Sequence, residues 1–202
     1  MHKRMIIQFV LLLVVVFFLS LIAGSLIHEG AHIVVQMIGG SQLKEVVVMP
    51  GIQLYPRFAL VHWSGYVAGV SLTKCSEQYI NGLSLMMGSS LNAIASYLLL
   101  AIIFRFPING RKKFVILLTS FILAWDLIGY SIFPLLSLRH WIFIGGNYCE
   151  PIAGASMLGI PIWLSYFIVF AHFVFYHFFF VKMFSSVAKN IFSINKGFIP
   201  PM

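Results

Sequence analysis

A run of residues without any charge, from Met5 to Ile27, limits most strongly what this chain can fold into. A helix needs about 20 consecutive apolar residues to cross a hydrocarbon core of about 30 Å. The rest of the chain has a similar character, because 60% of its residues are hydrophobic, 9% are charged and the mean hydropathy is +0.98. A water-soluble domain cannot bury that much apolar surface, so the sequence predicts an integral membrane protein.

Four apolar segments are long enough to be membrane spans, at about residues 5–38, 83–104, 114–138 and 151–181. The first span, as one continuous helix, would be about 51 Å long, so it must tilt, break or project from the bilayer. Its apolar run is longer than that of a signal peptide, which indicates a retained span. The expected fold is an all-α polytopic membrane protein with residues 1–202 in a single membrane-embedded domain.

The segment between the first and second spans, 41–81, is the only one of mixed composition. Residues 44–49 include several β-branched side chains, Pro50 and Gly51 favour a turn, and residues 52–55 alternate in polarity. We therefore expect a small β-rich segment, either a hairpin or a sheet, between the first and second spans.

The basic residues divide unevenly between the two sides of a four-span topology. Loops rich in Lys and Arg usually face the cytoplasm, and anionic headgroups explain the net charge of +8 better than nucleic acid does, because no extended basic patch is present. Nine Lys and Arg residues lie on the side of the two termini and four on the other side, which predicts a multi-pass protein of the cell membrane with cytoplasmic termini. The two groups are Lys3, Arg4, Arg105, Arg111, Lys112, Lys113, Lys182, Lys189 and Lys196, against Lys44, Arg57, Lys74 and Arg139.

Directly after the uncharged run the chain reads HEGAH, from His28 to His32. Residues four apart share a helix face, so both imidazoles can bind one zinc ion, and Glu29 is then placed to take a proton from water on the metal. Histidine and glutamate are costly within hydrocarbon, so their presence calls for a functional reason. The alternative is a pair of packing histidines, with Glu29 matched to a basic residue.

A catalytic zinc ion needs a third protein ligand besides two histidines. Asp126, the only aspartate, lies near the middle of the third span, where an unpaired carboxylate is costly. Its alternative role is a protonated side chain hydrogen-bonded to a neighbouring helix. Glu150 precedes Pro151 at the start of the fourth span, where helix capping is the alternative. Depth in the membrane favours Asp126, and both acids stay candidates.

Two polar or small residues of the second span, Gly88 and Asn92, are candidates for contact with substrate. An asparagine within a membrane usually reaches a polar partner, and its amide could hold a substrate backbone or polarise a carbonyl. The alternative is close helix packing with one interhelical hydrogen bond.

These residues together resemble the site-2 protease family of intramembrane zinc metalloproteases. The likeness consists of the HEGAH motif in an apolar helix, the Gly-x-x-x-Asn-like pair Gly88 and Asn92 one span later, and a membrane-embedded acid. It covers about residues 20–160 and implies one zinc ion, a β-rich segment after the first core helix, and a membrane-protein or peptide substrate.

The chain departs from the family in its third motif, Asn-x-x-Pro-x-x-x-Leu-Asp-Gly. Asp126 and Pro134 echo the Asn and Pro of that motif, which would move the acidic ligand to Glu150. Residues 150–161 also resemble a short, divergent branch of the family. Relatives usually place the His-Glu motif near the cytoplasmic end of its helix, whereas the charge count places His28 nearer the opposite side. The third ligand and the membrane face therefore stay open.

The sequence thus predicts a zinc-dependent endopeptidase that hydrolyses a peptide bond within or beside the lipid bilayer, with Glu29 as general base. A helical substrate must unwind to expose its carbonyl groups, and the strand-like segment could hold it extended by edge pairing. The alternative is a non-catalytic membrane protein of the same fold that binds or escorts other membrane proteins.

Overall fold

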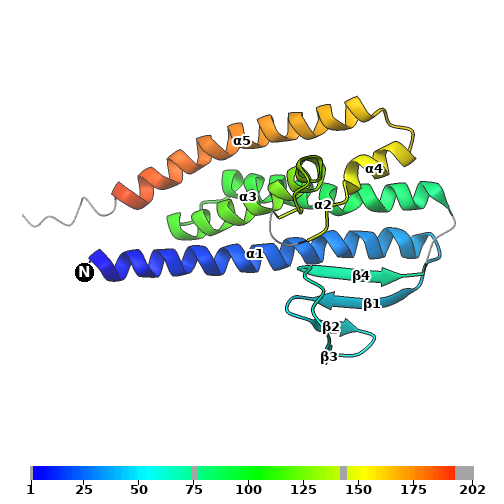
Figure 1. Cartoon of the computed structure of the whole chain (residues 1–202). Coiled ribbons are helices and arrows are strands. Elements are labelled where there is room, and N and C mark those ends of the chain that lie inside the picture. Colours follow the sequence, from blue (N-terminus) through cyan, green and yellow to red (C-terminus); the bar gives the residue numbers. More distant parts are fainter. Residues whose placement is uncertain (1, 74–76, 142–144, 194–202) are drawn as a thin grey trace, which may run out of the picture.

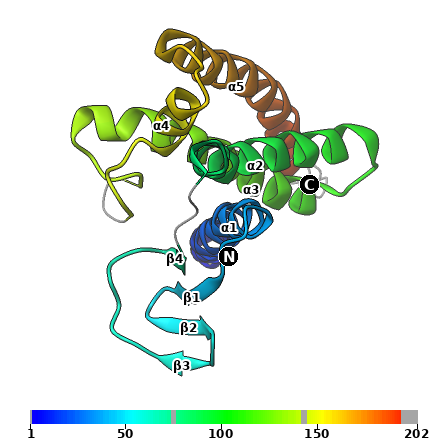
Figure 2. The same cartoon turned by 90° about the vertical axis from the view of Figure 1, so that its right-hand side faces the viewer.

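The fold, described by a computed structural model, is a bundle of long helices with a small sheet at one side (Figures 1 and 2). The structure describes residues 2–73, 77–141 and 145–193, with side chains over 7–73, 77–141 and 145–187. Its elements, in chain order, are α1 (His2–Ile38), β1 (Leu43–Val48), β2 (Ile52–Tyr55), β3 (Ala59–Leu60), β4 (Ala68–Leu72), α2 (Gln78–Arg105), α3 (Gly110–Ile132), the 3-10 turn η1 (Phe133–Leu136), α4 (Glu150–Met157) and α5 (Ile162–Ser193).

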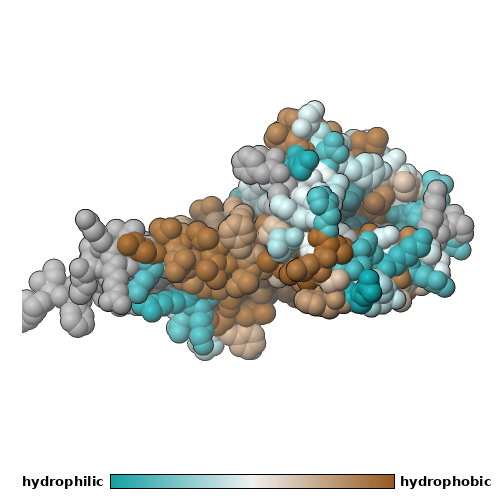
Figure 3. All heavy atoms as spheres, turned by 60° about the horizontal axis from the view of Figure 1, so that its bottom comes forward, coloured by the Kyte–Doolittle hydropathy of each residue, from teal (hydrophilic) through white to brown (hydrophobic). Residues whose placement is uncertain are grey.

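Four helices are long and apolar enough to cross a membrane, over Ile7–Ile38, Gln78–Arg105, Gly110–Leu136 and Ile162–Val187. The 37 residues of α1 form one unbroken helix, about 55 Å long at 1.5 Å per residue. Its first half carries a series of exposed large apolar side chains, which appears in Figure 3 as a largely brown surface away from the sheet. The predicted helical, multi-span architecture is confirmed.

Helix α2 is the centre of the bundle because small side chains line its buried positions. A Gly, Ser or Ala side chain lets a neighbouring helix approach closely, and such contacts drive helix association where the surrounding lipid is as apolar as the protein. The main neighbours of α2 are α1, α3 and α4. Its buried residues are Gly82, Ser84, Gly88, Ser89, Asn92, Ala93, Ser96, Leu100 and Ile103.

The four-stranded antiparallel sheet has the order β3-β2-β1-β4 and fills the segment predicted to be β-rich. The turn expected at Pro50 and Gly51 joins β1 to β2, and Gly51 adopts the positive φ of 106° that favours glycine. Strand β4 is an edge strand and lies next to the second half of α1 (Figure 1).

The predicted fourth span, 151–181, differs from the structure because it is divided into two helices. Helix α4 ends at Met157, the chain turns at Gly159 with φ of 78°, and α5 begins at Ile162, directly after Pro161. Hydropathy alone does not reveal this break, since both helices are apolar. The break lets α4 lie against α2 while α5 packs on α3.

Candidate metal centre

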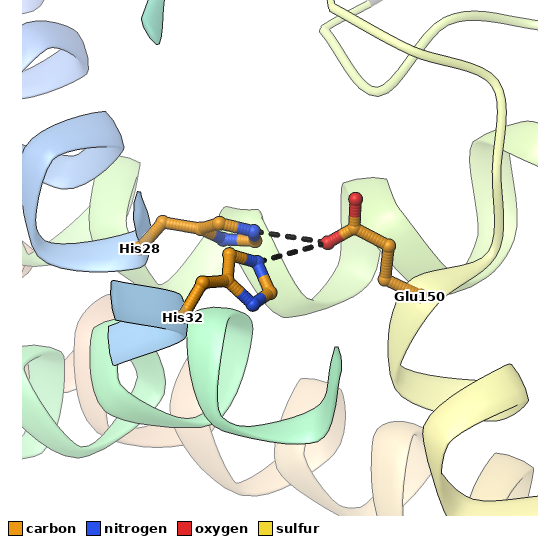
Figure 4. A group of neighbouring side chains, drawn as sticks. All are labelled: His28, His32 and Glu150. Carbon is orange, nitrogen blue, oxygen red and sulfur yellow. Dashed lines mark hydrogen bonds and ion pairs between the residues drawn. The ribbon is translucent and has the colours of Figure 1, made fainter. Parts of the chain in front are cut away.

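The two motif histidines project from α1 toward the start of α4. The His28 and His32 rings are adjacent, with centroids 4.8 Å apart, and the His28 residue is only 1% exposed. The Nε2 atoms of His28 and His32 lie 3.1 Å and 3.3 Å from one oxygen, Oε2 of Glu150 (Figure 4). We call these three residues the metal centre.

The three ligand atoms could hold a metal ion, and the distances of 3.1 Å and 3.3 Å to Glu150 Oε2 are those between neighbouring ligands of one ion. Among the residues that the structure describes, His28, His32 and Glu150 are the group whose potential ligand atoms all lie within 4.8 Å of one another. Zn–N and Zn–O bonds of about 2.0–2.2 Å in a tetrahedron place two ligand atoms about 3.3 Å apart. Two imidazoles and one carboxylate are also a known ligand set of catalytic zinc, which leaves one position open.

Each histidine is oriented by a polar group from a different helix. His28 Nδ1 lies 2.9 Å from Oδ2 of Asp126 on α3, and His32 Nδ1 lies 3.2 Å from Oγ of Ser84 on α2, both at hydrogen-bond distance. A proton on Nδ1 leaves the lone pair on Nε2, the atom that faces Glu150. Such outer partners fix the tautomer and ring orientation of metal-binding histidines.

Glu150 faces the histidines because α4 lies very close to α2. A Cβ atom on Gly154 would lie 2.5 Å from the Gly82 carbonyl oxygen, so these helices approach at backbone contact distance. Burial acts to raise the pKa of the Glu150 carboxyl, but hydrogen bonds and charge from His28 and His32 outweigh it and lower that pKa to about 2. Glu150 is thus an anion at neutral pH. It is the first residue of α4, and the residue before it, at the N-cap, makes no side-chain cap hydrogen bond.

The structure places Gly88 and Asn92 in contact with the first helix, and their contact with substrate stays a prediction. A Cβ on Gly88 would lie 2.7 Å from His28 Nε2, so the absence of a side chain makes room for the His28 ring. Asn92 is fully buried, and its Nδ2 donates a hydrogen bond to the Gly24 carbonyl of α1 at 2.9 Å. This is the interhelical bond expected from the alternative interpretation of Asn92.

A hollow of about 400 Å³ opens beside the metal centre. Its wall includes the carboxyl-bearing residues Glu29 and Glu150, together with residues 66–70, which contain the start of edge strand β4. The hollow therefore offers space for a ligand next to the predicted general base.

The structure separates the two acids that sequence reasoning left as alternatives. Glu150 faces the Nε2 atoms of both histidines, whereas Asp126 contacts the opposite nitrogen of His28. Asp126 is buried and contacts a neighbouring helix, which agrees with its alternative role in position, and the residue it contacts there is His28 of the motif. Sequence reasoning missed Ser84, although Ser84 and Gly88 are four residues apart on α2 and share a helix face.

Comparisons with protein-family models, with curated proteins and with solved structures give no match for this chain. What the chain does is therefore inferred from its own residues, and from the motifs quoted above.

Proposed function

We propose that this protein is a zinc metalloprotease that hydrolyses a peptide bond of a membrane protein or peptide, within or beside the bilayer. The observation that supports it best is the convergence of two imidazole nitrogens and one carboxylate oxygen beside a hollow lined by Glu29. Each converging atom can carry a lone pair, so the three need a cation among them, which is either a proton shared between an imidazole and the carboxylate or a metal ion. The resemblance to the site-2 protease family points to the same chemistry.

The proposed roles follow from the position of each side chain. His28, His32 and Glu150 would hold one zinc ion, which supplies a Lewis acid that polarises a carbonyl and lowers the pKa of water. Glu29 accepts a proton from the attacking water and delivers it to the leaving amine. Asp126 and Ser84 hold the two imidazoles in place from α3 and α2.

The edge strand β4 supports a peptide as the substrate. A substrate span must leave its helical form to expose a carbonyl, and unpaired strand groups can then bond to an extended chain. Strand β4 is at the sheet edge and Ala68–Val70 line the hollow beside Glu29. An extended segment along β4 would thus pass close to the general base.

The basic residues at one end of the bundle indicate which face the site serves. Arg105 ends α2, the segment 111–113 lies in the first turn of α3, and the metal centre lies toward the opposite end. Gly88, which contacts His28, is 17 residues before Arg105, or about 26 Å along the helix. With the basic end in the cytoplasm, cleavage takes place near the opposite face of the cell membrane.

Labelling with a membrane-impermeant maleimide tests this orientation. In a cysteine-free variant in intact cells, Trp163→Cys at the start of α5 should be labelled from outside, and Lys182→Cys should not. The reverse pattern would place the metal centre near the cytoplasm, as in relatives of the resembled family.

The decisive experiment on function is Glu29→Gln in purified protein reconstituted in liposomes. We expect about one zinc ion per chain in both forms, and cleavage of single-span test peptides by the unmodified protein only. The matched control is Glu77→Gln, because Glu77 is exposed at the N-cap of α2 and makes no capping hydrogen bond. Undiminished cleavage by Glu29→Gln would refute Glu29 as the general base. Absence of cleavage by the unmodified protein would refute the protease, and protein free of metal would favour the non-catalytic binder.

A further inference from the structure

Tyr130 of α3 lies in a stack of three aromatic rings that begins at the metal centre. Its ring centroid is 4.3 Å from that of His28 on one side and 3.6 Å from that of His140 on the other, with tilts of 32° and 30°. Tyr130 follows Asp126 by four residues, so both project from the same face of α3. The Tyr130 ring is therefore held from both faces.

The outer ring of the stack, His140, is itself fixed by its own loop. It is only 2% exposed, its Nε2 donates a hydrogen bond to the Tyr148 carbonyl at 2.7 Å, and its backbone N–H donates to the Gly146 carbonyl at 3.0 Å. Burial lowers the pKa of the His140 imidazole, which keeps the ring neutral at neutral pH. The loop thus supports Tyr130 without placing a charge against it.

Two polar atoms of this stack have no hydrogen-bond partner among the described residues: the buried Nδ1 of the neutral His140 ring, which is an acceptor, and the Tyr130 hydroxyl, which can donate. Tyr130 lines the hollow together with Glu29 and Glu150, and its hydroxyl has no hydrogen-bond partner among the described residues. A mostly buried tyrosine hydroxyl normally has a partner, as Tyr176 has with Ser120 at 2.8 Å. A donor without a partner, held rigidly beside a general base, is suited to a group on the substrate.

We propose that the Tyr130 hydroxyl donates a hydrogen bond to the carbonyl oxygen of the scissile peptide, where negative charge develops during hydrolysis. This inference rests on the proposed protease function. The water oxygen forms a bond to the carbonyl carbon, Glu29 accepts the water proton, and the proton passes to the nitrogen as the C–N bond breaks. Tyr130 keeps its own proton throughout.

The variant Tyr130→Phe isolates the hydroxyl because it keeps the ring and its stacking on His28 and His140. With a single-span peptide that the unmodified protein cleaves, kcat should fall by about a hundredfold at nearly constant KM and constant zinc content. Binding supplies a readout separate from turnover. Affinity for a phosphinic analogue of that peptide, whose tetrahedral phosphorus mimics the reacting carbon, should fall by a similar factor.

The control is Tyr97→Phe, since Tyr97 lies on α2 against α5 and its hydroxyl bonds to the His172 carbonyl. This variant should leave kcat and affinity for the analogue unchanged. Unchanged values in Tyr130→Phe would overturn the hydroxyl proposal alone, and loss of zinc would show that Tyr130 acts in packing instead. An unmodified protein without zinc-dependent cleavage would overturn the proposed function, and this inference with it.

Discussion

Two polar clusters among the described residues of this apolar bundle differ in how their donors and acceptors are matched. In the first, which we call the serine–tyrosine network, Ser120 donates to the Ser96 carbonyl at 2.8 Å and accepts from the Tyr176 hydroxyl at 2.8 Å, while His172 Nε2 donates to the Ala124 carbonyl at 3.0 Å. Each donor there meets an acceptor. In the metal centre, two imidazole nitrogens face one carboxylate oxygen, and all three are acceptors when each ring carries its proton on Nδ1.

The contrast separates polar groups that hold helices together from polar groups that bind something. A matched donor and acceptor in hydrocarbon need nothing further, and such a pair contributes modestly to helix association. Acceptors that converge need a cation, which is either a proton or a metal ion. The hollow adjoins only the second kind of cluster among the described residues, since Ser120, Tyr176 and His172 do not line it.

Removal of a converging acceptor should have the largest effect. In Glu150→Ala, zinc content should fall from about one ion per chain to almost none, because two imidazoles alone hold zinc weakly. Elemental analysis of purified protein measures this, with circular dichroism as the check on folding. If Glu150→Ala kept its zinc and Asp126→Ala lost it, Asp126 would be the third ligand.

The variant Gly88→Ala should have the next largest effect. Its Cβ would lie 2.7 Å from His28 Nε2, so the ring must move out of its position. A displacement of about 1 Å at a catalytic group costs on the order of a hundredfold in rate, which a cleavage assay would detect. Gly30→Ala is the matched control within the motif, because a Cβ there meets nothing within 4 Å. Equal losses in both variants would contradict the steric explanation.

The variant Asp126→Asn should have a smaller effect, because asparagine keeps the size of the side chain and removes its charge. We expect zinc affinity to fall by about tenfold to a hundredfold, as is typical when the outer partner of a metal-bound histidine is changed. Competition with a chelator measures this affinity. Ser84→Ala, which removes a neutral partner from His32, should cost less. A greater loss in Ser84→Ala would mean that His32 depends more on its outer partner than His28 does.

The sequence was sufficient to predict the parts of this molecule that depend on local pattern. Uncharged runs predicted the long helices, the residues on either side of Pro50 and Gly51 predicted β1 and β2 but not β3 and β4, and four-residue spacing put His28 and His32 on one face. The acids could not be assigned, because their contacts span 98 and 122 residues and depend on how α3 and α4 pack. The cost of burying a carboxylate predicted that Asp126 has a polar partner. That cost does not say whether the partner is a metal ion or a histidine that binds the metal ion.

Aromatic residues show the same limit. His140 stands beside Trp141 in a loop, which is typical of residues at the membrane interface, yet it is buried against Tyr130. The signal for Tyr130 was present in its spacing of four from Asp126 on α3. That spacing pointed to the candidate site only once the structure showed Asp126 beside His28.

The smallest effect should come from the serine–tyrosine network, and it should affect stability alone. In Tyr176→Phe the hydroxyl that bonds to Ser120 is lost, and interhelical hydrogen bonds of this kind contribute about 0.5–1.5 kcal/mol. Unfolding in mixed detergent micelles should show a loss of that size, with zinc affinity and cleavage unchanged. Such a result would show that a buried polar cluster can be weakened without effect on the site, provided its groups are matched among themselves. A change in zinc affinity would instead mean that α3 transmits strain from Ser120 to Asp126, six residues further along the same helix, and the two clusters would then act as one.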